Sequence, residues 1–217
     1  MEIYNLTSEN SLVSQYMMEL RDVNIHGDML RFRRNLERIG EIMAYEISKT
    51  LKYEAKEVHT PLAPCVCMEP AEKVVLATIF RAGLPFHQGF LSYFDHAENA
   101  FVSAYRKYKE KENFDVFIEY IASPDLNGKT VILCDPMLAT GTSMELSYRA
   151  LLTKGTPAHI HVASVIASEA AIEYIKKTFP EDKTTVWCGA IDPIINEHSY
   201  IVPGLGDAGD LAYGEKL

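Results

Sequence analysis

Residues 131–146 read VILCDPMLATGTSMEL, in which four apolar residues lead to an acid and then to a loop rich in hydroxyl side chains. A helical pattern follows, and the first backbone N–H groups of a helix have no partner within it, so they can bind a phosphate. The hydroxyls of Thr140, Thr142 and Ser143 add donors, so no lysine is needed. Asp135 can accept hydrogen bonds from the hydroxyl groups of a ribose. The pattern therefore indicates a candidate site for a ribose phosphate.

Two alternatives remain open for this loop. It lacks the Gly-Lys-Ser/Thr sequence of a Walker A motif, so it does not predict phosphoryl transfer from ATP. An ordinary strand-to-helix turn that uses glycine and threonine for capping has the same composition. On these residues alone, that structural interpretation is favoured.

A second glycine-rich stretch, YIVPGLGDAGD, occupies residues 200–210. Its Gly204, Gly206 and Gly209 match the spacing of a dinucleotide-binding fingerprint. That fingerprint must open a helix and be followed about 20 residues later by an acid that binds ribose. Only the eight residues 210–217 follow Gly209. The stretch is therefore interpreted as something other than a dinucleotide site, and a terminal turn shaped by proline and glycine fits it.

Other reactive residue types lack the spacing that their chemistry needs. His159 and His161 share a face of a predicted strand, but two ligands without a third are more typical of packing than of zinc binding. Cys65 and Cys67 lack the two-residue gap of redox pairs, and no serine-hydrolase elbow or zinc-protease helix motif occurs. Glu197 and His198 are interpreted as exposed. Hydrolase and protease functions have no support.

Residues 131–146 closely resemble the motif with which type I phosphoribosyltransferases bind 5-phosphoribosyl 1-pyrophosphate (PRPP). The form Asp-Pro-Met-Leu-Ala-Thr-Gly is similar to the uracil phosphoribosyltransferase subtype, and residues 200–210 resemble its C-terminal uracil-binding segment. LRD at 20–22, FRAGLP at 80–85 and an arginine entering a hairpin, Arg106, follow in the family's order. The resemblance covers most of the chain.

Two positions depart from the family pattern. Pro136 stands where most relatives carry a second acid, and Thr142 stands where the uracil subtype usually has glycine. We expect the threonine to be tolerated, because a residue at the start of a helix does not need a positive φ. It places an additional side chain beside the expected phosphate.

The resemblance implies a division of the site. The residues expected to bind PRPP are Arg81, Arg106, Asp135, Pro136, Met137, Leu138, Ala139, Thr140, Gly141, Thr142, Ser143 and Asp207. The residues expected to bind uracil are Ile201, Gly206, Asp207 and Ala208. Asp135, Arg106 and Asp207 are expected to be catalytic. No tightly bound metal is expected; Mg²⁺ would enter with PRPP, and Asp207 would face PRPP or its metal.

The implied reaction joins uracil to PRPP and releases UMP and diphosphate, a step of pyrimidine salvage. Three other functions stay open: a phosphoribosyltransferase for another nucleobase, an RNA-binding pyrimidine regulator on the same fold, and a catalytically inactive ligand-sensing homologue, for which Thr142 is the one hint. The formal net charge of −9 argues against the regulator, since RNA binding relies on Lys and Arg that meet phosphates. A GTP or UTP effector and a homo-oligomer of two or more copies are expected by analogy.

These residues need a scaffold, and the first half of the chain predicts part of it. A helix is predicted for residues 28–51, because Leu36, Ile39, Met43 and Ile47 recur at three- and four-residue spacing. Its arginines fall largely off this stripe and are interpreted as a solvated basic face; they are Arg31, Arg33, Arg34 and Arg38.

Apolar runs predict the strands. Residues 74–79 form a buried strand that ends in a turn carrying Arg81. The runs at 101–105 and 114–120 predict a hairpin whose polar tip, residues 106–113, would be a mobile lid. From residue 131 onward strand and helix patterns alternate, with strands at 131–134, 160–166 and 185–191, a helix that places Met144, Tyr148, Leu151 and Leu152 on one face, and a helix at 169–178.

Alternating strands and helices predict an α/β fold with a parallel sheet, whose ligands bind beyond the carboxyl ends of the strands. Arg81, Asp135 and the segment after Ile191 would meet there. The resemblance implies the type I phosphoribosyltransferase form of this fold, with a Rossmann-like core, a flexible β-hairpin and a small base-binding hood.

Composition sets wider limits. The 217 residues, 47% of them hydrophobic, suit a single domain spanning residues 1–217. The four cysteines show no metal-ligand pairing or disulfide framework, which favours a reducing cytoplasm. No targeting segment or membrane span is predicted, because no apolar run approaches the length of about 18 residues that a span needs.

Overall fold

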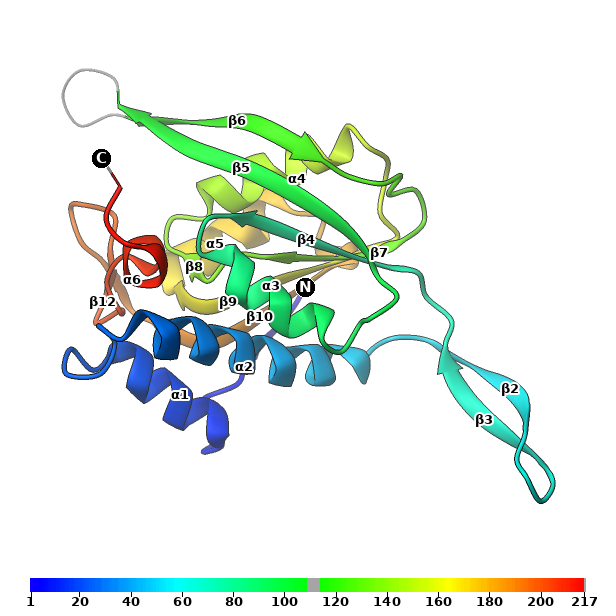
Figure 1. Ribbon diagram of the computed structural model, residues 1–217. Helices are drawn as coiled ribbons and strands as arrows, with labels where there is room; N and C mark the ends of the chain where they lie inside the picture. Colours follow the sequence, from blue (N-terminus) through cyan, green and yellow to red (C-terminus); the bar gives the residue numbers. More distant parts are fainter. Residues whose placement is uncertain (109–113, 217) are drawn as a thin grey trace.

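The computed structural model describes the backbone of residues 1–108 and 114–216, and the side chains of residues 1–103 and 119–216. Its central sheet runs in the order β1-β10-β9-β7-β4-β5-β6, with β8 beside β9 (Figure 1). The strands are β1 (Glu2–Asn5), β4 (Val74–Phe80), β5 (Glu98–Tyr108), β6 (Phe114–Ala122), β7 (Thr130–Cys134), β8 (Met137–Leu138), β9 (His159–Ser168) and β10 (Thr184–Asp192). Neighbours are parallel except β5 and β6, which form an antiparallel hairpin. The predicted parallel α/β sheet is confirmed.

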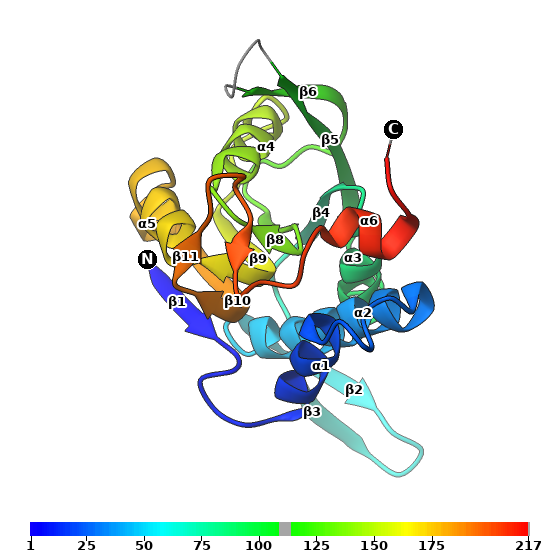
Figure 2. The same ribbon diagram turned by 90° about the vertical axis from the view of Figure 1, so that its left-hand side faces the viewer.

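Helices cover both faces of the sheet. One face carries α1 (Leu12–Arg21), α2 (Met29–Ser48) and α3 (Gly83–Leu91), and the other carries α4 (Thr142–Leu152) and α5 (Glu169–Thr178), with a 3₁₀ turn at Glu181–Lys183. The short α6 (Ala208–Tyr213) and the paired β11 (Ile194–Ile195) and β12 (Ile201–Val202) lie at the carboxyl edge of the sheet (Figure 2). No described helix is long and apolar enough to cross a lipid bilayer.

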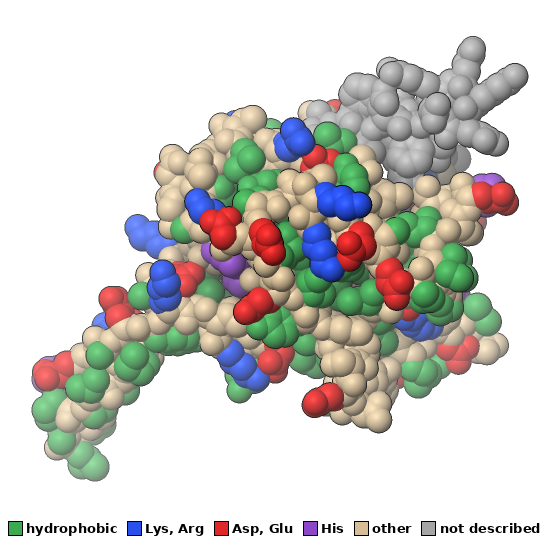
Figure 3. Space-filling model, turned by 180° about the vertical axis from the view of Figure 1, so that it is seen from behind, with side chains coloured by type: hydrophobic (Ala, Val, Ile, Leu, Met, Phe, Trp, Pro, Cys, Tyr) green, Lys and Arg blue, Asp and Glu red, His purple; other side chains and the backbone are tan. Residues whose placement is uncertain are grey.

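A second hairpin extends away from this body. It consists of β2 (Tyr53–His59) and β3 (Pro64–Pro70), joined in antiparallel register (Figures 1 and 3). Almost every residue of both strands is exposed, including Val66 at 68% and Met68 at 61%. This arm was not predicted from the sequence, because neither of its faces is buried and its strands therefore show no alternation of apolar and polar residues.

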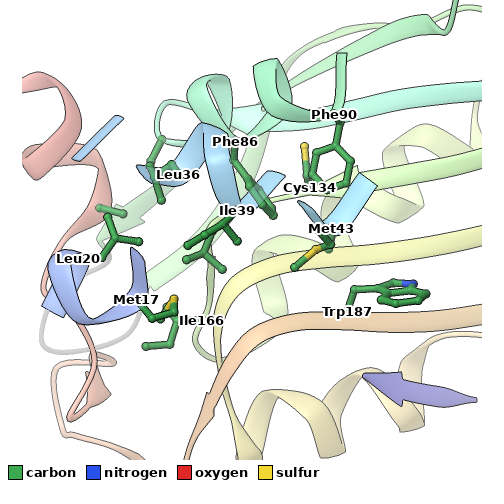
Figure 4. Close-up of a cluster of buried hydrophobic side chains, with 14 of the residues drawn as sticks. Met17, Leu20, Leu36, Ile39, Met43, Phe86, Phe90, Cys134, Ile166 and Trp187 are labelled. Carbon is green, nitrogen blue, oxygen red and sulfur yellow. The ribbon is translucent and has the colours of Figure 1, made fainter. Parts of the chain in front are cut away.

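The core forms two layers, because the central strands bury side chains on both faces. In β4, Leu76 faces the layer shared with α1, α2 and α3, whereas Val75 and Ala77 face the layer shared with α4 and α5. Figure 4 shows the first layer, where Phe86 of α3 and Met43 of α2 pack over the sheet. Burial on both faces explains why these strands read as continuous apolar runs.

Helix α2 confirms the predicted buried stripe, and Asp28 caps its start by accepting a hydrogen bond from the Arg31 N–H. The predicted solvated basic face is confirmed for Arg31 and Arg34, which are exposed, whereas Arg33 and Arg38 are half-buried. Arg31 pairs with the buried carboxylate of Glu19, and Arg33 donates to the Ala212 carbonyl at 2.6 Å. Buried acceptors on neighbouring helices recruit these charged side chains, which a helix pattern alone does not reveal.

The β5–β6 pairing confirms the predicted hairpin. β5 begins earlier and ends later than its apolar run, so residues 106–108 of the expected tip belong to the strand, and β6 begins where predicted and ends later. Residues 109–113 of the expected lid lie outside the described residues, as do the side chains of residues 104–118. The mobility of this tip stays a prediction.

Candidate active site

The candidate site lies at the carboxyl edge of the sheet. Arg81 follows β4, Asp135 follows β7, and Asp192 is the last residue of β10. Gly83 allows the first turn of α3 to approach this edge, because a Cβ on Gly83 would lie 2.3 Å from the Thr78 hydroxyl and 3.5 Å from the Cys134 carbonyl. The turn that carries Arg81 is thereby held beside the strand end that carries Asp135.

The phosphate loop, residues 135–143, joins β7 to α4. Asp135 is half-buried and accepts a hydrogen bond from the Met137 N–H at 3.2 Å, which turns the chain into β8. Gly141 precedes the first residue of α4 with φ 84°, and a Cβ there would lie 2.7 Å from the ring of Tyr174. Glycine is therefore required at this position by both conformation and space.

The starts of α3 and α4 lack a side-chain cap, unlike the starts of α1, α2 and α5. Ser11, Asp28 and Ser168 each cap a helix with a side-chain oxygen, whereas Gly141 offers none to α4. The hydroxyl of Thr140 lies 3.2 Å from that of Thr142 at the same helix start. An uncapped helix start with two hydroxyls suits an anionic ligand.

Thr142 is the first residue of α4. Among the described residues, the non-glycine residue with a positive φ is Ser199, so the threonine adopts no unfavourable backbone conformation. The expected conformational tolerance of Thr142 is confirmed.

Helix α5 packs against the phosphate loop and the first turn of α4 through Tyr174. The Tyr174 hydroxyl donates to the Glu145 carboxylate in the first turn of α4, and Arg149 pairs with the same carboxylate at 2.7 Å. These two contacts hold the pKa of Glu145 below its usual value, with the tyrosine hydrogen bond as the larger cause. Glu145 and Tyr174 were not predicted from the sequence, since their hydrogen bond joins two helices and leaves no local sequence pattern.

The base segment, residues 201–208, follows β11 and ends at the start of α6. Ile201 and Ala208 are buried, whereas Gly206 is exposed with φ 93°. Asp207 caps α6 through its Oδ1, which accepts hydrogen bonds from the N–H groups of Gly209 and Asp210. The segment therefore presents main chain at a fixed turn and a carboxylate at a helix start.

Arg81, just after the end of β4, contacts the helix that follows the base segment. Its Nη2 donates to Asp210 Oδ1 at 2.7 Å, and its Nη1 lies 3.3 Å from the Gly214 carbonyl. A Cβ on Gly209 would lie 3.1 Å from the same guanidinium, so glycine leaves room for the arginine. The arginine that is expected to bind PRPP thus contacts α6, the helix that directly follows the segment expected to bind uracil.

Comparison with known proteins agrees with this geometry. A family model described as uracil phosphoribosyltransferase matches residues 7–215. A curated uracil phosphoribosyltransferase from Porphyromonas gingivalis is 65% identical over 100% of both chains. The chain belongs to the uracil phosphoribosyltransferase family. One from Pyrococcus furiosus is 37% identical, over 96% of this chain and 89% of its own.

Solved structures support the family assignment at the level of fold. A protein from Aquifex aeolicus matches with a TM-score of 0.87 and 30% identity, covering 98% of each chain. A hypoxanthine phosphoribosyltransferase from Staphylococcus aureus matches with a TM-score of 0.50 and 15% identity over 74% of each chain, so it shares the fold alone. The predicted type I phosphoribosyltransferase fold is confirmed.

In this uracil phosphoribosyltransferase family member, the carboxylate of Asp207 is already engaged. Burial alone would raise its pKa, but the Asp210 N–H and the charge of Lys216, 3.2 Å away, outweigh burial and lower the pKa. Asp207 is thus ionised at neutral pH and can serve a cation or a hydroxyl group.

The arginine expected at the hairpin is placed only in part. Arg106 lies in β5 opposite Val116, and its side chain is outside the described residues. Its predicted contact with pyrophosphate stays a prediction.

Cys134 and His161 are engaged in packing. Burial raises the pKa of the Cys134 thiol to about 12, so it stays protonated. His161 accepts a hydrogen bond from Trp187 Nε1 at 3.1 Å, and burial, helped by His159, lowers its pKa to about 3. His161 thus packs against Trp187, and His159 lies 3.0 Å from the Thr185 hydroxyl, as the packing interpretation predicts. Glu197 and His198 are exposed, as predicted.

Proposed function

We propose that this chain transfers the phosphoribosyl group of PRPP to uracil, producing UMP and diphosphate in pyrimidine salvage. The supporting observation is the contact of Arg81 with the C-terminal helix, at the sheet edge that also carries the phosphate loop and the base segment. The 65% identical relative carries the name of this activity.

In the proposed mechanism, the N–H groups at the start of α4 and the hydroxyls of Thr140 and Thr142 bind the 5′-phosphate, and Asp135 accepts hydrogen bonds from the ribose hydroxyls. Pro136, Met137, Leu138 and Ala139 would contact PRPP mainly through main chain, because the side chains of Pro136 and Leu138 are buried. The bond between ribose C1 and the pyrophosphate oxygen breaks, its electron pair leaves with diphosphate, N1 of uracil bonds to C1, and the N1 proton is released to solvent. We assign no side chain as general base, so the rate enhancement comes from positioning of the substrates and from electrostatic stabilisation of the transition state.

Arginine suits the leaving pyrophosphate, because its planar guanidinium binds two oxygens and stays charged. In the proposed complex Arg81, with Arg106 from the hairpin, binds the pyrophosphate. The Arg81 side chain is 40% exposed in its pair with Asp210, so an anion can reach it. Closure of the hairpin would exclude water that otherwise hydrolyses PRPP.

Main chain is proposed to select the base. Uracil alternates carbonyl acceptors and N–H donors along one edge, and the groups of Ile201, Gly206 and Ala208 would pair with that edge. A base that leaves such buried groups unpaired is rejected, because each unpaired group loses its hydrogen bond.

Mg²⁺ prefers oxygen ligands and usually binds through one or two carboxylates together with substrate phosphates. Within the described residues, no cluster of three or more His, Cys, Asp or Glu side chains forms a metal site. The ionised Asp207 offers Oδ2 once Lys216 moves aside, so it fits a cation bound mainly by PRPP. When bound, Mg²⁺ neutralises charge on the departing diphosphate.

The deciding experiment incubates the pure chain with uracil, PRPP and Mg²⁺ and measures UMP and diphosphate. Stoichiometric formation of both is expected, and their absence would exclude the proposed function. Parallel reactions with hypoxanthine, guanine and orotate test another base, and a salt-dependent RNA-binding assay tests the regulator. Activity with another base alone would replace uracil as the substrate.

We propose three further properties of the chain. A homo-oligomer is favoured by the exposed apolar residues of the arm, since an isolated two-stranded hairpin has little stability of its own. Sedimentation velocity of the chain measures the number of copies in the assembly.

Cytoplasmic location is supported by the four free cysteines. A GTP or UTP effector is tested by adding either nucleotide to the assay.

A further inference from the structure

A buried ion pair lies behind the base segment. Arg21, the last residue of α1, donates from Nη1 and Nη2 to the two carboxylate oxygens of Asp192, at 2.7 and 2.8 Å. The Asp192 side chain is 7% exposed and the Arg21 side chain 26%. The two residues are 171 positions apart in the sequence, so this contact fixes α1 against the end of β10.

The same pair holds one residue of the base segment through both its N–H and its carbonyl. Arg21 Nη1 donates to the Gly204 carbonyl at 2.9 Å, and Gly204 N–H donates to Asp192 Oδ2 at 2.8 Å. Gly204 has φ 62°, and a Cβ there would lie 2.0 Å from the Ile201 carbonyl. The turn is therefore tightly folded and anchored at its centre by two charged side chains.

The ionisation of Asp192 agrees with this geometry. Burial alone would raise its pKa, but the hydrogen bonds from Arg21 and from the Gly204 N–H outweigh burial and lower the pKa. The anchor is thus charged on both sides at neutral pH, and charge-assisted hydrogen bonds are the stronger kind.

We propose that Arg21 and Asp192 are positioning residues that set the main-chain conformation of residues 201–206, around Gly204, and thereby the affinity for uracil; Asp207 is held separately, as the cap of α6. Gly204 lies between Ile201 and Gly206, whose main-chain groups are proposed to pair with the base. A displacement of that turn misaligns the groups on either side, and small displacements reduce binding and rate strongly. This inference rests on the proposed function.

A matched ion pair on the same helix provides the control. Glu19 of α1 accepts from Arg31 Nε and Nη2 at 2.9 and 2.8 Å, and its side chain is 6% exposed. That pair joins α1 to α2 and, among the described residues, makes no hydrogen bond to the base segment. Removing the Glu19–Arg31 pair therefore tests whether weaker attachment of α1, by itself, changes the kinetics.

The test compares Arg21→Lys with Arg31→Lys in the full chain, by steady-state kinetics with uracil and PRPP. A lysine keeps the charge but cannot form the two-pronged contact. Arg21→Lys is expected to raise the KM for uracil by roughly tenfold and to leave the KM for PRPP within about twofold. Asp192→Asn should give the same split, and the double variant should be less than additive. Arg31→Lys should change neither KM.

Equal rises in both KM values, or the same uracil effect in Arg31→Lys, would overturn the inference. Hydrogen–deuterium exchange of residues 201–208, measured without substrates, tests the positioning role independently of the proposed function. Arg21→Lys should accelerate exchange of that segment more than Arg31→Lys does. If the wild type makes no UMP, the proposed function fails, and unchanged exchange in Arg21→Lys would overturn the positioning role by itself.

Discussion

The phosphate loop and the base segment lie at the same edge of the sheet but are held in different ways. The loop takes its position from the next βα unit: Met137 and Leu138 pair with β9, and Tyr174 of α5 packs on Gly141. The base segment lies outside the alternating strands and helices. It is anchored by Arg21 from the N-terminal part of the chain, and the helix that follows it is held by Arg81.

This contrast explains why one half of the site is easier to recognise than the other. A phosphate is bound by generic features of a strand, a loop and a helix start, and these leave a local sequence pattern. A base is selected by main-chain groups whose positions depend on remote contacts. Mutations should therefore separate the two halves, with PRPP effects near residues 135–143 and uracil effects from residues far from 201–208 in sequence.

The strongest loss of activity is expected from the carboxylate of the phosphate loop. Asp135→Asn should lower kcat on the order of 100-fold, because it removes the charge that orients the ribose hydroxyls in the transition state. The thermal unfolding midpoint should stay close to that of the wild type. Asp182→Asn, an exposed carboxyl in the 3₁₀ turn after α5, is the control. An unchanged rate would remove Asp135 from the site.

A smaller effect is expected from the contact beneath the loop. Gly141→Ala should destabilise the fold by about 3 kcal/mol, through the positive φ and the overlap with Tyr174, and should raise the KM for PRPP more than that for uracil. Gly128→Ala isolates the backbone cost, because Gly128 has φ 70° and a Cβ there would meet no described atom within 4 Å, so it should cost only about 1 to 2 kcal/mol. Urea unfolding measures both, and equal costs would contradict the Tyr174 contact.

The weakest effect is expected from the hydroxyl of Tyr174. Tyr174→Phe keeps the ring against Gly141 but removes the hydroxyl that donates to Glu145, so the KM for PRPP should rise by only about threefold. The KM for uracil should not change. Tyr148→Phe is the control, since Tyr148 lies on the adjacent α4 and its ring stacks on Phe179. A rise in the uracil KM of Tyr174→Phe would show that the two halves are not independently supported.

Several parts of the fold were predictable from the residues. The apolar runs indicated the parallel strands, and the periodicity indicated α2, because burial on one or both faces leaves a regular pattern. The arm at β2 and β3 was not predictable in this way, since it buries neither face. Residues 1–217 as a single domain, and the roles of Arg106 and Asp207 in catalysis, stay predictions.

Local chemistry was readable from the residues alone: a carboxylate at a strand end, a loop rich in hydroxyls that leads into a helix, and a glycine-rich turn near residue 204. The residues that hold these parts together became visible only in the folded chain. Arg21, Asp192, Glu145 and Tyr174 are anchors because the fold brings their charges and hydroxyls to buried partners. Such contacts join residues far apart in the chain, so no periodicity or short motif encodes them.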